Sequence, residues 1–229
     1  MTIVSRSTLD QELQCLQDDL LRMGSRLDSA IERALKALVN RDLALARQLV
    51  AEDELINALR YQIEEACYTT LATQAPAARD LRAVMAAFSI ASDLERMADH
   101  AAGIATITIR LGVEPLLKPL IDIPRMAEAC RDMLRQALEA YVARDTAKAR
   151  AVAQMDDVID NLYQQVFREL LTFMLEDPHT LSRALPLLFV AHNLERIGDR
   201  AVNVAERTVF IASGELKEFK SEPPATNAT

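Results

Sequence analysis

The chain contains the same sequence unit twice, and this duplication limits the folds that it can adopt. "ASDLERMADHAAGIA" at residues 91–105 matches "AHNLERIGDRAVNVA" at residues 191–205. "RDLALARQLVAEDELIN", which begins at Arg41, likewise resembles "RDTAKARAVAQMDDVID", which begins at Arg144. Because both matches occur in the same order, the repeated unit spans about 100 residues. The two halves of the chain should therefore share one fold.

The composition indicates that this fold is helical. Half of the 229 residues are hydrophobic, only 5 are glycine, and tryptophan is absent. Ala, Leu, Glu and Arg dominate, and these residues favour helix over sheet. The sequence therefore predicts an all-α protein of two tandem three-helix bundles, related by the internal duplication through a pseudo-two-fold axis.

Capping residues, prolines and glycines suggest where the helices begin and end. Asp42 is a suitable N-cap, Pro76 can open a third helix, and Gly112 can end it. Asp177-Pro178 can open the last helix of the second half, which should end near Gly214. The expected helices cover residues 8–40, 43–72, 76–112, 124–143, 145–176 and 177–214. The first bundle is then 8–112, the Pro-rich connector 113–123, the second bundle 124–214, and a disordered tail 215–229.

Charge and cysteine content suggest the compartment and the class of partner. The formal net charge is −8, which is unfavourable for nucleic-acid binding because phosphate contacts need clustered Lys and Arg. Cys15, Cys67 and Cys130 show no metal-binding spacing, and we expect buried thiols in a reducing compartment. The first residues lack a signal-peptide core, and the apolar runs are too short to span a bilayer. We therefore expect a cytoplasmic protein.

Two acidic pairs are the candidate functional residues. Glu95 and Asp99 stand four positions apart in the first repeat, and Glu195 and Asp199 stand in the same frame in the second. Carboxylates at this helical spacing repel each other by a few tenths of a kcal/mol. A repeated unfavourable arrangement suggests that a cation binds there.

The preceding helix of each half can add ligands, if consecutive helices are antiparallel. Counting from the turns places Asp156 level with Asp199 and Asp160 level with Glu195, and in the first half Asp53 level with Asp99. Such oxygen-rich sites suit Mg, Mn or Ca, or iron when carboxylates dominate. The predicted metal ligands are Asp53, Glu95, Asp99, Asp156, Asp160, Glu195, Asp199 and Asn203.

The alternative for these pairs is an ordinary solvated acidic surface, neutralised by Arg96, Arg196 or Arg200 from neighbouring helices. The three histidines are most simply surface residues, although His192 could supplement a metal site. No nucleotide-binding fingerprint or nucleophile–base pair is visible in the sequence.

The chain resembles the PhoU family. The resemblance rests on "QAPAARDLRAVMAAFSIASDLERMADHAAGIA" at residues 74–105 and "NLERIGDRAVNVAE" at residues 193–206, within a duplicated helical chain, and covers residues 8–214. The family's E/D-x-x-x-D motif corresponds here to Glu95–Asp99 and Glu195–Asp199. The resemblance implies two three-helix bundles side by side, and a regulator of phosphate uptake without catalytic activity.

The resemblance also implies partners and cofactors. Family members link the ATPase subunit of the phosphate ABC transporter to the sensor histidine kinase of the phosphate regulon, and they repress signalling when phosphate is plentiful. Some members bind metal ions, or iron or zinc clusters, through the acidic motifs. We therefore expect these two partners, a homodimer, and bound Fe, Zn, Mn, Mg or Ca. The chain departs from the pattern at Asn57, which stands where the second half has Asp160, so the first site should bind metal more weakly.

Two other functions remain open. A carboxylate-bridged di-iron enzyme needs Glu-x-x-His on each of two helices. The one such motif here, Glu176 to His179, is broken by Asp177-Pro178. A helical scaffold that binds partners without metal is the second alternative.

Overall fold

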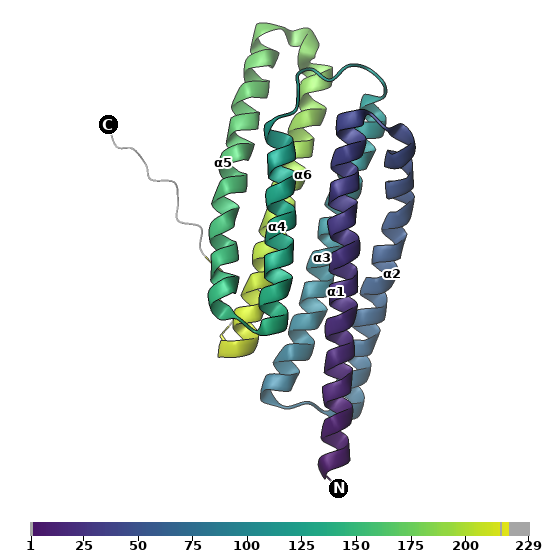
Figure 1. The fold of residues 1–229 in the computed structure, drawn as a ribbon, viewed down its shortest axis with the longest axis vertical. Helices are drawn as coiled ribbons and strands as arrows, with labels where there is room; N and C mark the ends of the chain where they lie inside the picture. The colour runs from purple at the N-terminus through teal and green to yellow at the C-terminus, as the bar shows by residue number, and fades with distance from the viewer. Residues whose placement is uncertain (1, 216, 220–229) are drawn as a thin grey trace, which may run out of the picture.

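The computed structural model describes residues 2–215 and 217–219, and within these residues the chain is helical with no strand. Three long antiparallel helices form one bundle, and three more form a second bundle at its side (Figure 1). The first bundle contains α1 (Thr2–Asn40), α2 (Leu43–Gln74) and α3 (Ala78–Leu111). The second contains α4 (Asp122–Ala143), α5 (Thr146–Glu176), the 3-10 turn η1 (Pro178–Thr180) and α6 (Leu181–Ser213). The predicted fold class is confirmed.

Equivalent aspartates start the second helix of each bundle. The side chain of Asp42 accepts hydrogen bonds from the backbone N–H groups of Ala44 and Leu45. Asp145 does the same for the two equivalent residues in the second bundle. These bonds satisfy two of the N–H groups that a helix leaves free at its start. The repeat is therefore visible in the local structure of its turns.

Several helix boundaries differ from those expected. α1 begins at Thr2 instead of residue 8, and α4 begins at Asp122, two residues before Pro124, because a proline fits in the first turn of a helix. Pro76 does not open α3, which begins at Ala78. A proline disfavours the right-handed helical region for the residue before it, and Ala75 adopts a left-handed φ of 45°.

Burial of the cysteines agrees with the prediction at two positions of three. Cys67 and Cys130 are buried, and their thiols donate to the carbonyl oxygens of Val84 and Leu194. Cys15 is exposed, so that prediction was wrong. Its neighbour Leu16 belongs to the buried face of α1, and Cys15 lies on the face turned to solvent.

The two bundles pack mainly through α3 against α6, with α1 against α4 as the second contact. Positions 93 and 193 correspond in the repeat, and so do positions 100 and 200. Nη1 of Arg200 lies 3.5 Å from Oδ1 of Asp93, and Nδ1 of His100 lies 2.9 Å from Oδ1 of Asn193. Each contact is thus the counterpart of the other, as a two-fold axis between the repeats requires. His100 is half-buried in this interface and is not the surface residue that we expected.

An ion-pair group also joins α1 to α4. The guanidinium of Arg131 donates to both carboxylate oxygens of Asp28, at 2.9 and 3.0 Å, and to Glu32 at 2.8 Å. Planar two-point pairing of this kind is among the stronger surface interactions. It links the two bundles through α1 and α4.

The predicted disordered tail falls largely outside the described residues, which include only Glu215 and residues 217–219 of it. The backbone N–H of Phe219 donates to Glu206 at 2.6 Å, and the guanidinium of Arg150 lies over the Phe219 ring at 5.6 Å. The start of this segment is therefore held against the second bundle. Among the described helices, none combines the length and the apolar character needed to cross a membrane.

Candidate metal centre

The second bundle brings its four predicted carboxylates into one electrostatic group. α5 supplies Asp156 and Asp160, and α6 supplies Glu195 and Asp199, with one helical turn between the members of each pair. After burial, Asp160, Asp199 and Glu195 are the main causes that raise the pKa of Asp156. The carboxylates of the two helices are therefore close enough to repel one another. The level count made from the sequence also brings these four residues together, and their role as metal ligands stays a prediction.

Asp156 is the most perturbed member of the group. Burial and the neighbouring carboxylates raise its pKa from the ordinary 3.8 to about 7. Its Oδ1 is buried and has no hydrogen-bond partner. A buried acceptor without a partner costs about 1–3 kcal/mol, and more when it is charged. This oxygen is thus available to a cation or a proton.

Gly198 allows Asp156 to lie against α6. A Cβ atom added to Gly198 would lie 2.7 Å from Oδ1 of Asp156 and 2.9 Å from Cδ1 of Ile159. Real Cβ contacts essentially never fall this short. The equivalent residue in the first repeat is Ala98, so this close approach is specific to the second bundle.

The remaining carboxylates of the second bundle are partly compensated. Nη1 of Arg196 donates to Oδ2 of Asp199 at 2.6 Å. Nδ1 of His192 lies 3.3 Å from Oε2 of Glu195, but this buried oxygen still lacks a partner with hydrogen-bond geometry. Burial and Asp199 raise the pKa of Glu195. Of the arginines expected to neutralise the acidic surface, only Arg196 pairs with this group, since Arg200 pairs with Asp93.

The first bundle differs because an arginine of the preceding helix lies beside its acidic motif. Nε of Arg60, on α2, lies 3.6 Å from Oε1 of Glu95, and its Nη1 donates to Glu64 at 2.6 Å. Arg60 lowers the pKa of Glu95, against the effects of burial and Asp99. The equivalent position in the second bundle is Tyr163, which cannot neutralise a carboxylate. The two acidic motifs therefore have different electrostatic surroundings.

The other predicted ligands of the first bundle lie beside Glu95. Burial and the nearby Asp99 raise the pKa of Asp53. The amide of Asn57 donates to Oδ2 of Asp53 at 3.4 Å. The neutral amide of Asn57 thus stands where the second bundle has Asp160. The guanidinium of Arg60 stands where it has Tyr163.

Asn203 makes a different contact from the one predicted. Its side-chain Nδ2 donates to Oδ1 of Asp93, on α3, at 3.2 Å. Asp93 is buried, and it also lies 3.5 Å from Nη1 of Arg200. The amide of Asn203 therefore helps to satisfy a buried carboxylate between the bundles, and its assignment as a metal ligand stays a prediction.

The donor chemistry of the second bundle suits a hard divalent cation, because its ligands are carboxylate oxygens and two of them are buried without hydrogen bonds. The side chains do not form a closed coordination site as they stand. Within residues 2–215 and 217–219, no group of three or more His, Cys, Asp or Glu side chains is arranged to hold a metal ion. Metal binding therefore stays a prediction.

Sequence reasoning missed Arg60 and Gly198, which distinguish the two sites. A position-by-position comparison of the repeats would have found both, since they align with Tyr163 and Ala98. Predicting the contacts of His100 with Asn193 and of Asp93 with Arg200 requires the angle between α3 and α6. The sequence does not supply this angle.

Comparison with known proteins gives one consistent family. The family model described as "PhoU domain" matches residues 20–108 and again residues 123–208. The chain is 41% identical over 205 residues to the "Phosphate-specific transport system accessory protein PhoU homolog" of Zymomonas mobilis, which covers 90% of this chain and 86% of the relative. The relative of the same name from Aquifex aeolicus is 39% identical, covering 91% of this chain and 94% of the relative.

Solved structures agree with the sequence comparisons. PhoU from Pseudomonas aeruginosa superposes with a TM-score of 0.86 at 34% identity, covering 90% of this chain and 99% of that one. The phosphate transport system regulatory protein PhoU from Streptococcus pneumoniae gives 0.85 at 32% identity, with coverage of 91% and 99%. These similarities extend over both bundles.

Proposed function

Since the chain belongs to the PhoU family, we propose that it is an accessory protein of phosphate-specific transport that regulates phosphate uptake. The names of its relatives support this role, because they describe accessory or regulatory proteins. The matched region spans nearly the whole length of this chain and of the relative from Aquifex aeolicus. The proposed role is therefore one of the whole chain and not of a single bundle.

The finer proposal is a negative regulator without catalytic activity. When phosphate is plentiful, the protein restrains uptake and represses phosphate-starvation signalling. It does so as an adaptor between the ATPase subunit of the phosphate ABC transporter and the sensor histidine kinase of the phosphate regulon. Two bundles with long helices suit an adaptor, because each partner can bind a separate surface.

Metal binding by the second bundle is part of this proposal. Asp156, Asp160, Glu195 and Asp199 would hold the cation, and Asp156 carries the argument through its buried oxygen without a partner. A divalent cation would neutralise the repulsion that raises the pKa of Asp156 and join α5 to α6. Because Arg60 already supplies a positive charge beside Glu95, we expect the second bundle to be the stronger metal site.

Deletion of the protein in its host tests the regulatory function. We expect phosphate-starvation genes to stay on in high phosphate, as measured with a reporter fused to one of their promoters. The wild-type chain should restore repression. If repression persists in the deletion strain, the proposed regulation is wrong for this chain.

Complementation with a metal-site variant separates the metal-binding adaptor from a scaffold that works without metal. Glu195→Gln with Asp199→Asn keeps the side-chain shapes but removes two charges. Partial or no rescue by this variant, at equal protein level, supports a metal-dependent regulator. Full rescue would favour the metal-independent scaffold.

A further inference from the structure

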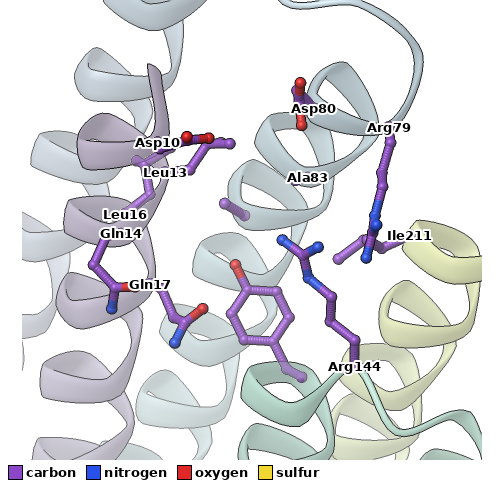
Figure 2. Close-up of a pocket in the computed structure, with 12 residues that line it drawn as sticks. Asp10, Leu13, Gln14, Leu16, Gln17, Arg79, Asp80, Ala83, Arg144 and Ile211 are labelled. Atoms are coloured by element: carbon purple, nitrogen blue, oxygen red, sulfur yellow. The ribbon is translucent and has the colours of Figure 1, made fainter. Parts of the chain in front are cut away.

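A second site lies far from the carboxylates, at the end of the molecule where α3 begins and α6 ends. A cavity of about 200 Å³ is lined there by α1, by the first turns of α3, by the end of α4 and by Ile211 of α6. Figure 2 shows this cavity with the side chains that line it. Because its walls come from both bundles, a ligand bound there would contact both repeats.

A buried tyrosine without a partner is the first observation that points to a ligand. Tyr141 lines the cavity and is only 8% exposed. Its hydroxyl makes no hydrogen bond with any described residue. The ring is buried, but the hydroxyl oxygen stays accessible from the cavity, so a ligand there can accept its hydrogen bond. Burial raises the pKa of Tyr141 to about 12, so the phenol is a neutral donor at physiological pH.

Two arginines supply positive charge at the same cavity. Arg79 enters it from α3 and Arg144 from the turn after α4. Neither guanidinium forms an ion pair or hydrogen bond within the described part of the chain. Arg144 lowers the pKa of Tyr141 against the effect of burial, which places its charge near the phenol. A phenol and two guanidinium groups are all hydrogen-bond donors, and the complementary ligand is an anion.

The start of α3 adds further donors. Its N-cap is Ala77, which has no side chain to accept hydrogen bonds from the first backbone N–H groups. The N–H of Asp80 already donates to the carbonyl oxygen of Ala77 at 3.1 Å, whereas the helix dipole still favours an anion at this terminus. Asp10 and Asp80 also line the cavity, but neither pairs with an arginine there. In Figure 2 both carboxylates lie in the upper part of the view, and the guanidinium groups lie nearer its middle.

The size of the cavity limits the ligand. Pockets for drug-sized molecules usually measure about 300–1,000 Å³, whereas a water molecule occupies about 30 Å³ in the liquid. A volume of about 200 Å³ therefore suits a small ion with a few waters.

We propose that this cavity binds a small tetrahedral oxyanion of the phosphate type, through Tyr141, Arg79 and Arg144. This inference does not depend on the proposed regulatory function or on metal binding. The first repeat provides a comparison within the same chain. The equivalent turn has Arg41, with φ 56° against 53° for Arg144, but Arg41 donates to the carbonyl oxygen of Val113 and has Leu38 in place of Tyr141.

Titration with inorganic phosphate tests the proposal. Chelator-treated full-length protein is titrated by calorimetry at constant ionic strength, so that neither bound metal nor screening changes during the experiment. We expect saturable binding of one phosphate per chain. Tyr141→Phe and Arg144→Gln should each weaken it about tenfold, as expected for the loss of a hydrogen bond to a charged ligand. Arg41→Gln, the matched control at the equivalent turn, should leave it unchanged.

Two results would overturn the proposal. One is the absence of saturable phosphate binding by the wild-type protein. The other is binding that Arg144→Gln leaves unchanged. Arg144 is exposed, so its substitution should not affect folding, and circular dichroism of each variant checks this. A thermal melt gives a second readout, since phosphate should raise the melting temperature of the wild type and of Arg41→Gln by the same amount.

Discussion

Replacing Asp156 by asparagine should stabilise the metal-free protein at alkaline pH. The native pKa of about 7 lies above the ordinary 3.8, so between about pH 4 and pH 7 the folded state binds a proton that the unfolded state does not. Stability from this group is therefore fully present below about pH 4 and is lost as the pH rises through about 7. Above that range, the folded protein carries a charge that it disfavours.

The size of this effect follows from the change in pKa. A rise from 3.8 to about 7 corresponds to about 4 kcal/mol, at 1.36 kcal/mol per pH unit. The carboxyl is only partly buried, and solvent screening reduces the value, so we expect about 2 kcal/mol. For a chain of this length, that is a rise in melting temperature of roughly 4–8 °C. Asparagine has nearly the same shape and should fit beside Gly198.

The assay is thermal or urea unfolding with chelator, at pH 8 and at pH 4.5. The variant should be more stable than wild type at pH 8, and the difference should shrink to about 1 kcal/mol at pH 4.5, because the unfolded chain is fully protonated at Asp156 only below about pH 4. The matched control is Asp157→Asn, an adjacent exposed carboxylate, which should change stability by less than about 0.5 kcal/mol. If Asp156→Asn lowers stability at pH 8 without metal, Asp156 has favourable partners and the proposed repulsion is wrong.

Three further substitutions test other contacts. Gly198→Ala should destabilise the protein by about 1–3 kcal/mol in urea unfolding, because its Cβ would lie 2.7 Å from Asp156, and unchanged stability would contradict this geometry. Arg60→Gln should increase metal affinity at the first acidic motif, measured by calorimetry in a Glu195→Gln background, and unchanged affinity would show that Arg60 does not compete with metal. Arg131→Gln should cost about 1 kcal/mol of stability by removing its bonds between α1 and α4, and a cost near zero would assign no role in packing to that group.

The fold was predictable because the repeat and the helix caps are local signals. Asp42 and Asp145 are N-caps as expected, and Gly112 and Gly214 follow the helices that they were expected to end, each with positive φ. The positions of Pro76 and Pro178 were harder to interpret, because proline suits both a turn and the first turn of a helix. The structure places Pro76 in a turn and Pro178 in a 3-10 turn.

The candidate site was predictable only in outline. Counting residues from a turn places carboxylates on adjacent helices at one level, since the helical rise is constant. Counting does not give the direction of a side chain around the helix axis. For this reason the contact between the Asn203 amide and Asp93 was not foreseen, and Arg60 was overlooked although it lies beside Glu95.

Elemental analysis of protein purified without a metal-affinity tag tests the central claim most directly. We expect a divalent metal that stays bound through gel filtration and is lost in Glu195→Gln with Asp199→Asn. The equivalent pair Glu95→Gln with Asp99→Asn, in the bundle that contains Arg60, should retain most of it. Two results would contradict the assignment of the cation site to the second bundle. One is wild-type protein that is purified without metal and takes up no Fe, Zn, Mn, Mg or Ca. The other is metal that is lost only when Glu95 and Asp99 are replaced.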